Sequence, residues 1–241
     1  MLEIRNLSKT YRGASVKAVD DLSLHVRPGE IFGFLGPNGA GKTTTIKSVV
    51  GLLKPDQGEI LIDGVDALKQ PVEAKKRTGF VPDTPELYDK LTAREYLSFV
   101  ADVFMVPSDE RERRTSELLE MFQLQDSLDE LVQSFSHGMK QKLAVTGALL
   151  HSPSLLILDE PMTGLDPRSS HLFKDLMRRH CDRSNAVFFS THVLEVAERL
   201  CDRIGIINRG RLIAVGTMDD LRQQAAETSS LESIFLELTR E

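Results

Sequence analysis

The chain contains no tryptophan and few tyrosines, and it has no low-complexity tract that would predict a disordered segment. Cysteine is scarce too: Cys181 and Cys201 form no metal-binding pattern, and we expect two free thiols in a reducing compartment. No segment approaches the ~20 uninterrupted apolar residues that a membrane span requires. Residues Met1–Arg5 contain no apolar signal region, which predicts a cytosolic chain. The net charge of −6 argues against a general nucleic-acid binder.

The pattern of the chain changes character twice. An apolar fraction of 41% supports a sizeable core, arranged either as one large α/β domain or as a domain with an inserted lobe. Short apolar runs predict strands up to about residue 82, helical spacing follows from about 84 to 150, and strand character then returns. We expect an α/β core interrupted by a helical lobe. The predicted strands are Leu2–Leu7, Leu22–Val26, Ile31–Leu35, Glu59–Ile62, Ser154–Leu158, Ala186–Ser190 and Arg203–Ile207.

Two further local signals belong to this layout. The alternating charges of Asp109–Arg114 predict a solvated helix face. Asp166 followed by Pro167 predicts the start of a helix, because aspartate caps helices well and proline is favoured at the first helical position.

A complete Walker A loop occupies residues 36–44, Gly-Pro-Asn-Gly-Ala-Gly-Lys-Thr-Thr. A glycine-rich turn of this kind can direct a nest of backbone N–H groups at phosphates. Lys42 adds positive charge for the β- and γ-phosphates, and the Thr43 hydroxyl can ligate Mg²⁺. The loop predicts nucleotide triphosphate binding by Gly36, Pro37, Asn38, Gly39, Ala40, Gly41, Lys42, Thr43 and Thr44.

Residues 155–160, Leu-Leu-Ile-Leu-Asp-Glu, have the pattern of a Walker B strand, an apolar run ending in two carboxylates. Ligands of α/β folds bind at the carboxyl ends of the strands. We expect Asp159 to hold Mg²⁺ and Glu160 to accept a proton from, or orient, the attacking water. The transition from strand to loop would allow these adjacent side chains to turn toward one site.

At this point the chain resembles the ATP-binding subunits of ABC transporters, and the resemblance covers nearly its whole length. Ser134–Lys142 is similar to the family's signature segment, whose usual core is Leu-Ser-Gly-Gly-Gln. The resemblance implies that Ser136 and Gly138 contact the γ-phosphate bound by the opposite subunit, through the amino terminus of a helix. Three positions depart from the usual core: Phe135, His137, which we interpret as a surface residue, and Met139.

Other segments resemble the remaining conserved loops of that family. Gly164–Pro167 is similar to the D-loop, which links the two ATP sites of a dimer. Ser190-Thr191-His192 is similar to the switch, which implies that His192 lies beside the γ-phosphate and stabilises its charge. Tyr11 resembles the aromatic residue that stacks on adenine, with simple packing as the alternative.

Residues 79–83, Gly-Phe-Val-Pro-Asp, depart from the family pattern, which commonly places glutamine after the proline. In the family that glutamine touches Mg²⁺ and transmits its state to the helical lobe. Asp83 is shorter and charged, but a carboxylate oxygen remains a good ligand for a hard cation. We therefore expect Asp83 to take the Mg²⁺ and coupling role.

The Met-Lys-Gln run at 139–141, the continuation of the Walker B strand and the carboxyl-terminal segment together resemble the bacterial ABC-2 exporter group. In that last segment, Ser229 with Glu232 can form a capping box. An apolar stripe follows, which could pack on the chain's own core or contact a second subunit. Its members are Leu231, Ile234, Phe235 and Leu238.

The resemblance implies a P-loop α/β core (1–83 and 151–228), a helical signature lobe (84–150), a small antiparallel β subdomain and a carboxyl-terminal helix (229–241). It implies a Mg²⁺-dependent ATPase in which two chains, identical or related, sandwich ATP. Such a pair powers a transmembrane permease from the cytoplasmic face of the cell membrane, and we expect export. An importer ATPase subunit and a soluble ABC ATPase outside transport are the alternatives, and we expect no nucleic-acid partner. The transported substrate is chosen by the membrane subunit, which is another chain.

Overall fold

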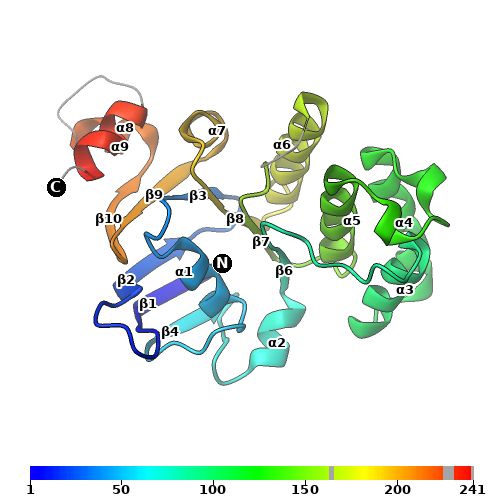
Figure 1. The fold of residues 1–241 in the computed structure, drawn as a ribbon, viewed down its shortest axis with the longest axis horizontal. Coiled ribbons are helices and arrows are strands. Elements are labelled where there is room, and N and C mark those ends of the chain that lie inside the picture. The colour runs from blue at the N-terminus through cyan, green and yellow to red at the C-terminus, as the bar shows by residue number, and fades with distance from the viewer. Residues whose placement is uncertain (163–165, 225–230, 240–241) are drawn as a thin grey trace.

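The computed structural model describes residues 1–162, 166–224 and 231–239, and two β-sheets form its body (Figure 1). The smaller sheet is antiparallel, in the order β2-β1-β4-β5. In β2, Leu22, Leu24 and Val26 are buried while the residues between them are exposed, which is the alternation of a half-buried antiparallel strand. The strands are β1 (Leu2–Lys9), β2 (Val19–Val26), β4 (Gln57–Ile62) and β5 (Val65–Asp66).

The larger sheet has six strands in the order β10-β9-β3-β8-β7-β6, and every neighbouring pair except β9 and β10 is parallel. Every residue of its central strands β3, β8 and β7 is buried, as their continuous apolar runs predict for a sheet covered on both faces. The carboxyl ends of the parallel strands therefore meet along one edge. The strands are β3 (Ile31–Leu35), β6 (Thr78–Val81), β7 (Leu155–Asp159), β8 (Ala186–Thr191), β9 (Arg203–Asn208) and β10 (Arg211–Gly216).

Three α-helices inserted between β6 and β7 gather on one side of the molecule, coloured green in Figure 1: α3 (Ala93–Val103), α4 (Ser108–Phe122) and α5 (His137–Leu149). Two short 3-10 helices, η1 (Gln125–Ser127) and η2 (Val132–Ser134), lie between α4 and α5. Thr92 and Glu95 start α3 with a capping box in which each side chain accepts a hydrogen bond from the other residue's N–H. The rings of Phe122 in α4 and Phe173 in α6 (Pro167–Cys181) lie 5.4 Å apart, so the inserted helices share a core with the sheet. The predicted α/β fold class, with inserted helices and an antiparallel sheet, is confirmed.

The remaining helices are short. They are α1 (Lys42–Val49), α2 (Pro71–Lys76), α7 (Leu194–Leu200), α8 (Met218–Gln224) and α9 (Leu231–Thr239). No helix within the described residues is long and apolar enough to cross a membrane. Cys181 and Cys201 are free thiols, as predicted.

The charged run at the start of α4 is less solvated than its alternating signs predict. The Arg114 side chain is 19% exposed and is paired with the Glu110 carboxylate. Its guanidinium also donates a hydrogen bond of 2.7 Å to the carbonyl of Leu150. Leu150 is the C-cap of α5, where carbonyl groups lack partners within the helix. The solvated-face prediction is therefore wrong at Arg114, which satisfies the end of a neighbouring helix.

The apolar stripe of α9 packs on the chain's own core. Leu231 and Ile234 are fully buried in a cluster with residues of β9, α7 and α8. Phe235 and Leu238 are partly buried against the same cluster, and Leu236 stays exposed. The predicted capping residue Ser229 lies outside the described residues. Of the two alternatives for this stripe, intramolecular packing is the one observed.

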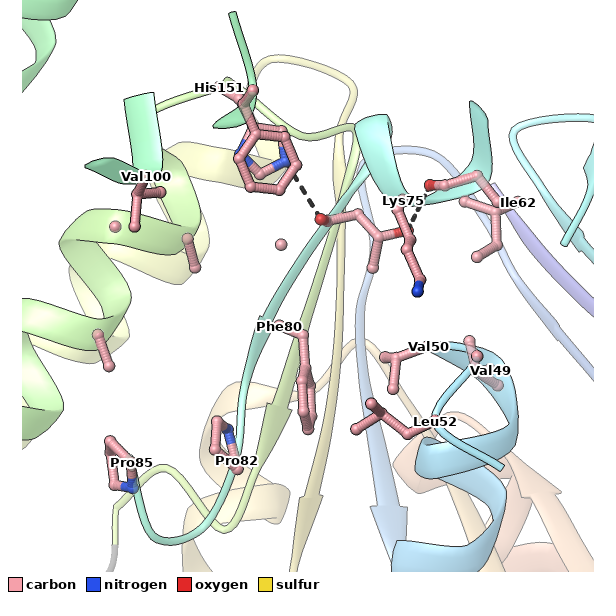
Figure 2. A pocket seen from close by; sticks show the side chains of 18 of the residues that line it. Val49, Val50, Leu52, Ile62, Lys75, Phe80, Pro82, Pro85, Val100 and His151 are labelled. Atoms are coloured by element: carbon pink, nitrogen blue, oxygen red, sulfur yellow. Dashed lines mark hydrogen bonds between the residues drawn. The ribbon is translucent and has the colours of Figure 1, made fainter. Parts of the chain in front are cut away.

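An apolar cavity of about 350 Å³ lies between the end of α1, strand β6 and the inserted helices (Figure 2). Val50, Leu52, Phe80 and Val100 line it. The His151 ring closes one side, with Nε2 3.1 Å from the carbonyl oxygen of Thr78. This cavity marks the boundary between the sheet and the inserted helices.

Candidate active site

The Walker A loop connects β3 to α1, and two of its glycines admit no other residue. A Cβ atom on Gly36 would lie 2.4 Å from the carbonyl oxygen of Ile207. Gly41 has a φ of +110°, and its Cβ would meet the carbonyl of Ala18 at 2.4 Å. Gly41 is also the N-cap of α1, which has neither a capping side chain nor an acidic residue in its first turn. The first N–H groups of α1 are therefore directed into the loop, as an anion site requires.

The other loop residues divide into exposed and buried sets. The tip of the loop, Pro37, Asn38 and Gly39, is exposed, and so is Thr43. Ala40 and Thr44 are buried. The loop therefore presents its tip and the Thr43 side chain to solvent, while its base packs against β9 and the turn that follows β9.

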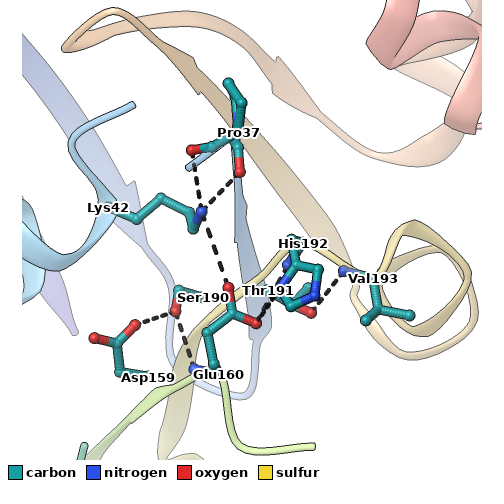
Figure 3. Close-up of polar contacts among 9 residues, drawn as sticks. Pro37, Lys42, Asp159, Glu160, Ser190, Thr191, His192 and Val193 are labelled. Atoms are coloured by element: carbon teal, nitrogen blue, oxygen red, sulfur yellow. Dashed lines mark hydrogen bonds and ion pairs between the residues drawn. The ribbon is translucent and has the colours of Figure 1, made fainter. Parts of the chain in front are cut away.

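Lys42 lies almost fully buried at the base of the loop (Figure 3). Its ammonium donates hydrogen bonds to the carbonyls of Gly36 (2.7 Å) and Pro37 (3.3 Å) and lies 3.9 Å from Oε1 of Glu160. Burial lowers the pKa of Lys42, and the neighbouring Glu160 and Asp159 carboxylates act in the opposite direction. The result is a desolvated cation beside the helix start, where electrostatic attraction to a phosphate is strong.

Tyr11 lies beside the same loop. Its hydroxyl is 3.2 Å from Oγ1 of Thr44, and its side chain remains nearly half exposed. A ring held at the loop but left open to solvent suits a platform for a base better than it suits core packing.

Glu160 directly follows β7, and the backbone changes direction at this residue. Its φ of +50° is left-handed, which is uncommon for a residue other than glycine. Its backbone N–H donates to the carbonyl oxygen (3.2 Å) and the hydroxyl oxygen (3.1 Å) of Ser190. Its carboxylate lies 2.9 Å from Nδ1 of His192 (Figure 3). The structure thus brings Lys42, Glu160 and His192 together, with the carboxylate between the two other side chains.

Asp159 sits at the end of β7 and is 3% exposed. Burial raises the pKa of its carboxyl, and the nearby charge of Asp83 adds to the effect. Hydrogen bonds from the Ser190 and Thr43 hydroxyls oppose that rise in pKa. The Asp159 carboxyl is therefore influenced by both Thr43 and Asp83, and Asp83 itself is exposed in the loop after β6.

The described residues contain no group of three or more His, Cys, Asp or Glu side chains that could hold a metal ion by themselves. Mg²⁺ does not need such a cage, because it commonly takes one or two carboxylates together with substrate phosphates and water. A buried carboxylate that is hydrogen-bonded to the Thr43 hydroxyl fits that ion.

Sequence reasoning missed the importance of Ser190, which contacts both Asp159 and Glu160. The sequence feature that could have identified Ser190 is its position near the end of a predicted parallel strand that neighbours β7. In that register Asp159 and Ser190 are direct partners, so their side chains had to meet at the sheet edge.

The signature residues lie elsewhere. Ser136 caps α5, with its hydroxyl oxygen accepting a hydrogen bond of 3.3 Å from the N–H of Met139, and Gly138 follows in the first turn. In Figure 1, α5, which Ser136 caps, and α1, which follows the Walker A loop, occupy different parts of the molecule. Among the three departures, Phe135 is buried, Met139 packs against the same core and His137 is exposed.

The D-loop is described only in part. Gly164 and Leu165 lie outside the described residues. Asp166 caps α6, accepting a hydrogen bond of 2.9 Å from the N–H of Ser169, and Pro167 occupies the start of the helix. The predicted helix start is confirmed.

Comparison with known sequences extends this picture over the whole chain. The family model described as "ABC transporter" matches residues 19–163. The chain is 37% identical over 240 residues to the ABC transporter ATP-binding protein NatA of Bacillus subtilis (strain 168), covering 98% of this chain and 97% of that protein. It is 40% identical over 220 residues to the Nod factor export ATP-binding protein I of Rhizobium etli, covering 91% of this chain and 69% of the relative.

Solved structures agree. A structure described as the ATP-binding subunit of an ABC transporter superposes with a TM-score of 0.95 at 38% identity, covering 100% of both chains. A dimeric ATP-binding cassette in a post-hydrolysis state, bound to ADP and Pi, matches with a TM-score of 0.82 at 25% identity, over 90% of this chain and 99% of that one. The chain therefore belongs to the ABC transporter family, as an ATP-binding and ATP-hydrolysing subunit of such a transporter.

Proposed function

We propose that this chain hydrolyses Mg²⁺-bound ATP to power a separate transmembrane permease that exports its substrate. The observation that carries the catalytic part is the position of the Glu160 carboxylate between Lys42 and His192. Export is supported by the Nod factor export relative, which is 40% identical to this chain.

In the proposed reaction, the Walker A backbone and Lys42 bind the β- and γ-phosphates, and Tyr11 stacks on adenine. Glu160 accepts a proton from the attacking water, and His192 holds the Glu160 carboxylate and the γ-phosphate in place. Each contribution is electrostatic or positional, which is what phosphoryl transfer requires of a protein.

The Mg²⁺ ion would be held by Thr43 and Asp159, with Asp83 at the edge of the site, and it would neutralise charge on the phosphates. Asp83 follows β6 and precedes the inserted helices, so it is also the residue that we expect to connect the site to the lobe.

The signature residues require a second chain. The amino terminus of α5 is solvent-accessible at Ser136, and phosphate groups bind readily at such helix starts. We therefore propose a dimer in which Ser136 and Gly138 of each chain contact the ATP held by the other. The dimeric relative supports this arrangement.

The permease would dock at the signature lobe, residues 84–150, and hold the dimer at the cytoplasmic face of the membrane. The core would comprise residues 1–83 and 151–228, and the carboxyl-terminal helix residues 229–241. The apolar cavity lies at the boundary between the core and the lobe. A movement of the lobe relative to the core would therefore change its shape.

Replacement of Glu160 by glutamine tests the catalytic assignment. The amide keeps the size of the side chain but removes its basicity, so turnover should fall by ~10²–10⁴-fold, the usual contribution of a general base. ATP affinity should persist, because Lys42 and the loop are untouched. Phosphate release and equilibrium ATP binding measure the two quantities.

Glu117→Gln is the matched control, because Glu117 lies on the exposed side of α4 and pairs only with Arg113 among the residues described. It should hydrolyse ATP at the wild-type rate. Normal turnover in Glu160→Gln would remove Glu160 from the catalytic role.

A further inference from the structure

Ser190 stands at the centre of the site's hydrogen bonding without facing solvent. It is 0% exposed, and it lies on β8 between the strands that carry the two nucleotide motifs. Its neighbour in β7 is Asp159, and the next residue, Thr191, is paired with Leu35 at the end of β3. Ser190 therefore lies in the strand between the two motifs, with its side chain beside the end of β7.

A serine hydroxyl has one proton to donate and two lone pairs to accept with. The Ser190 hydroxyl donates to Oδ1 of Asp159. Its oxygen accepts from the N–H of Glu160 at 3.1 Å. One buried hydroxyl thus binds both acidic residues, one through its side chain and the other through its backbone.

The two contacts do different things. The hydroxyl fixes Oδ1 of the Asp159 carboxylate, so Oδ2 is the oxygen that this contact does not occupy and that would ligate the proposed Mg²⁺. The second contact holds the backbone of Glu160 in its left-handed conformation, which directs that carboxylate toward Lys42 and His192. Backbone conformations of this kind persist only where surrounding groups hold them.

We propose that Ser190 is a positioning residue that sets both the Mg²⁺ ligand Asp159 and the catalytic Glu160 through its single hydroxyl. The proposal rests on the proposed function of these two residues. Because Ser190 is fully buried, its hydroxyl bonds these two residues rather than solvent.

Ser190→Ala tests the proposal, with Mn²⁺ as the probe. Binding of Mn²⁺ in the presence of a non-hydrolysable ATP analogue can be measured by electron paramagnetic resonance, independently of turnover. Loss of a residue that orients a metal ligand typically costs ~10–100-fold in metal affinity or activity, and we expect a decrease of that size in both. Binding of the analogue in EDTA should be unchanged.

Threonine and valine at the same position separate the hydroxyl from the shape of the side chain, because they differ only by a hydroxyl for a methyl. Ser190→Thr should restore Mn²⁺ affinity relative to Ser190→Val. Thr78→Val is the matched control for losing a buried hydroxyl, since Thr78 donates only to the carbonyl of Ala74 (2.9 Å) at the opposite end of the sheet. That control should bind Mn²⁺ as the wild type does.

Wild-type Mn²⁺ affinity and turnover in Ser190→Ala would overturn the positioning role, and so would equal Mn²⁺ affinities in the threonine and valine variants. Should the alanine variant not fold, the threonine and valine pair decides the question alone. A wild-type chain that binds no Mn²⁺ with the analogue would instead overturn the proposed function.

Discussion

The charged residues of the site occupy two kinds of surroundings. Lys42 and Asp159 are nearly buried, at 7% and 3% exposure, and each is fixed by hydrogen bonds to its neighbours. His192 and Asp83 have exposed side chains at the solvent-facing edge of the site. In the proposed function, the buried pair would be preorganised for phosphate and cation, whereas the exposed pair would respond to the nucleotide or to a partner.

Tyr11 is also exposed at the edge of the site. Replacing it by alanine or by phenylalanine separates the contribution of its ring from that of its hydroxyl. Tyr11→Ala should weaken ATP binding about tenfold, equivalent to ~1.4 kcal/mol, because stacking on a base is typically worth ~1–3 kcal/mol. Tyr11→Phe keeps the ring and loses only the contact with Thr44, so it should bind ATP nearly as well as wild type. Isothermal titration calorimetry measures both.

Inorganic triphosphate provides the control for this prediction, because it has no base to stack. Its affinity should be the same in Tyr11→Ala and in the wild type. An ATP affinity that is unchanged in Tyr11→Ala would identify Tyr11 as a packing residue.

Among the elements, those with a complete local pattern were predictable from sequence. The apolar run Ile31–Leu35 coincides with β3, since burial on both faces leaves no alternation to misread. The hairpin to β10 was not predicted. It turns at Arg209 and Gly210, both with positive φ, and the sequence lacks the Asn-Gly signal usual for such turns.

Contacts set by tertiary structure were the harder part. Arg114 appeared solvated because its partner, the Leu150 carbonyl, lies 36 residues away in sequence. Ser190 was likewise hidden, because its role appears only when β7 and β8 are placed side by side. The motifs of the candidate site were readable because each is a continuous segment, whereas the residues that orient them come from neighbouring strands.

Helix α9 is the element whose packing can be tested most directly. Ile234 is fully buried, so Ile234→Ala should lower the free energy of unfolding by ~2–5 kcal/mol, the usual cost of removing a large buried side chain. Leu236→Ala on the exposed side of the same helix should change it by less than ~0.5 kcal/mol. Chemical denaturation measures both, and equal losses would contradict the observed packing.

At the scale of the whole molecule, the Walker loops and the start of α5 are the two halves of the proposed ATP site. The Walker loops lie at the carboxyl edge of the large sheet, while the start of α5 belongs to the inserted helices (Figure 1). Because these halves lie in different parts of one chain, the proposed dimer would complete two sites at once. Its formation should require the γ-phosphate, because both halves would contact that group in the proposed dimer.

The dimer prediction uses Glu160→Gln, which should retain intact ATP and so elute from size-exclusion chromatography as two chains with MgATP and as one with MgADP. Adding Ser136→Asp should keep it monomeric, because a carboxylate at the start of α5 repels phosphate charge. Ser136→Asn is the neutral control of nearly equal size, and both residues cap helices well, so α5 should stay intact. Dimers with asparagine and monomers with aspartate would place the α5 start at the phosphate. Dimers with both would show that the contact lies elsewhere, and a Glu160→Gln chain that stays monomeric in saturating MgATP would contradict the sandwich itself.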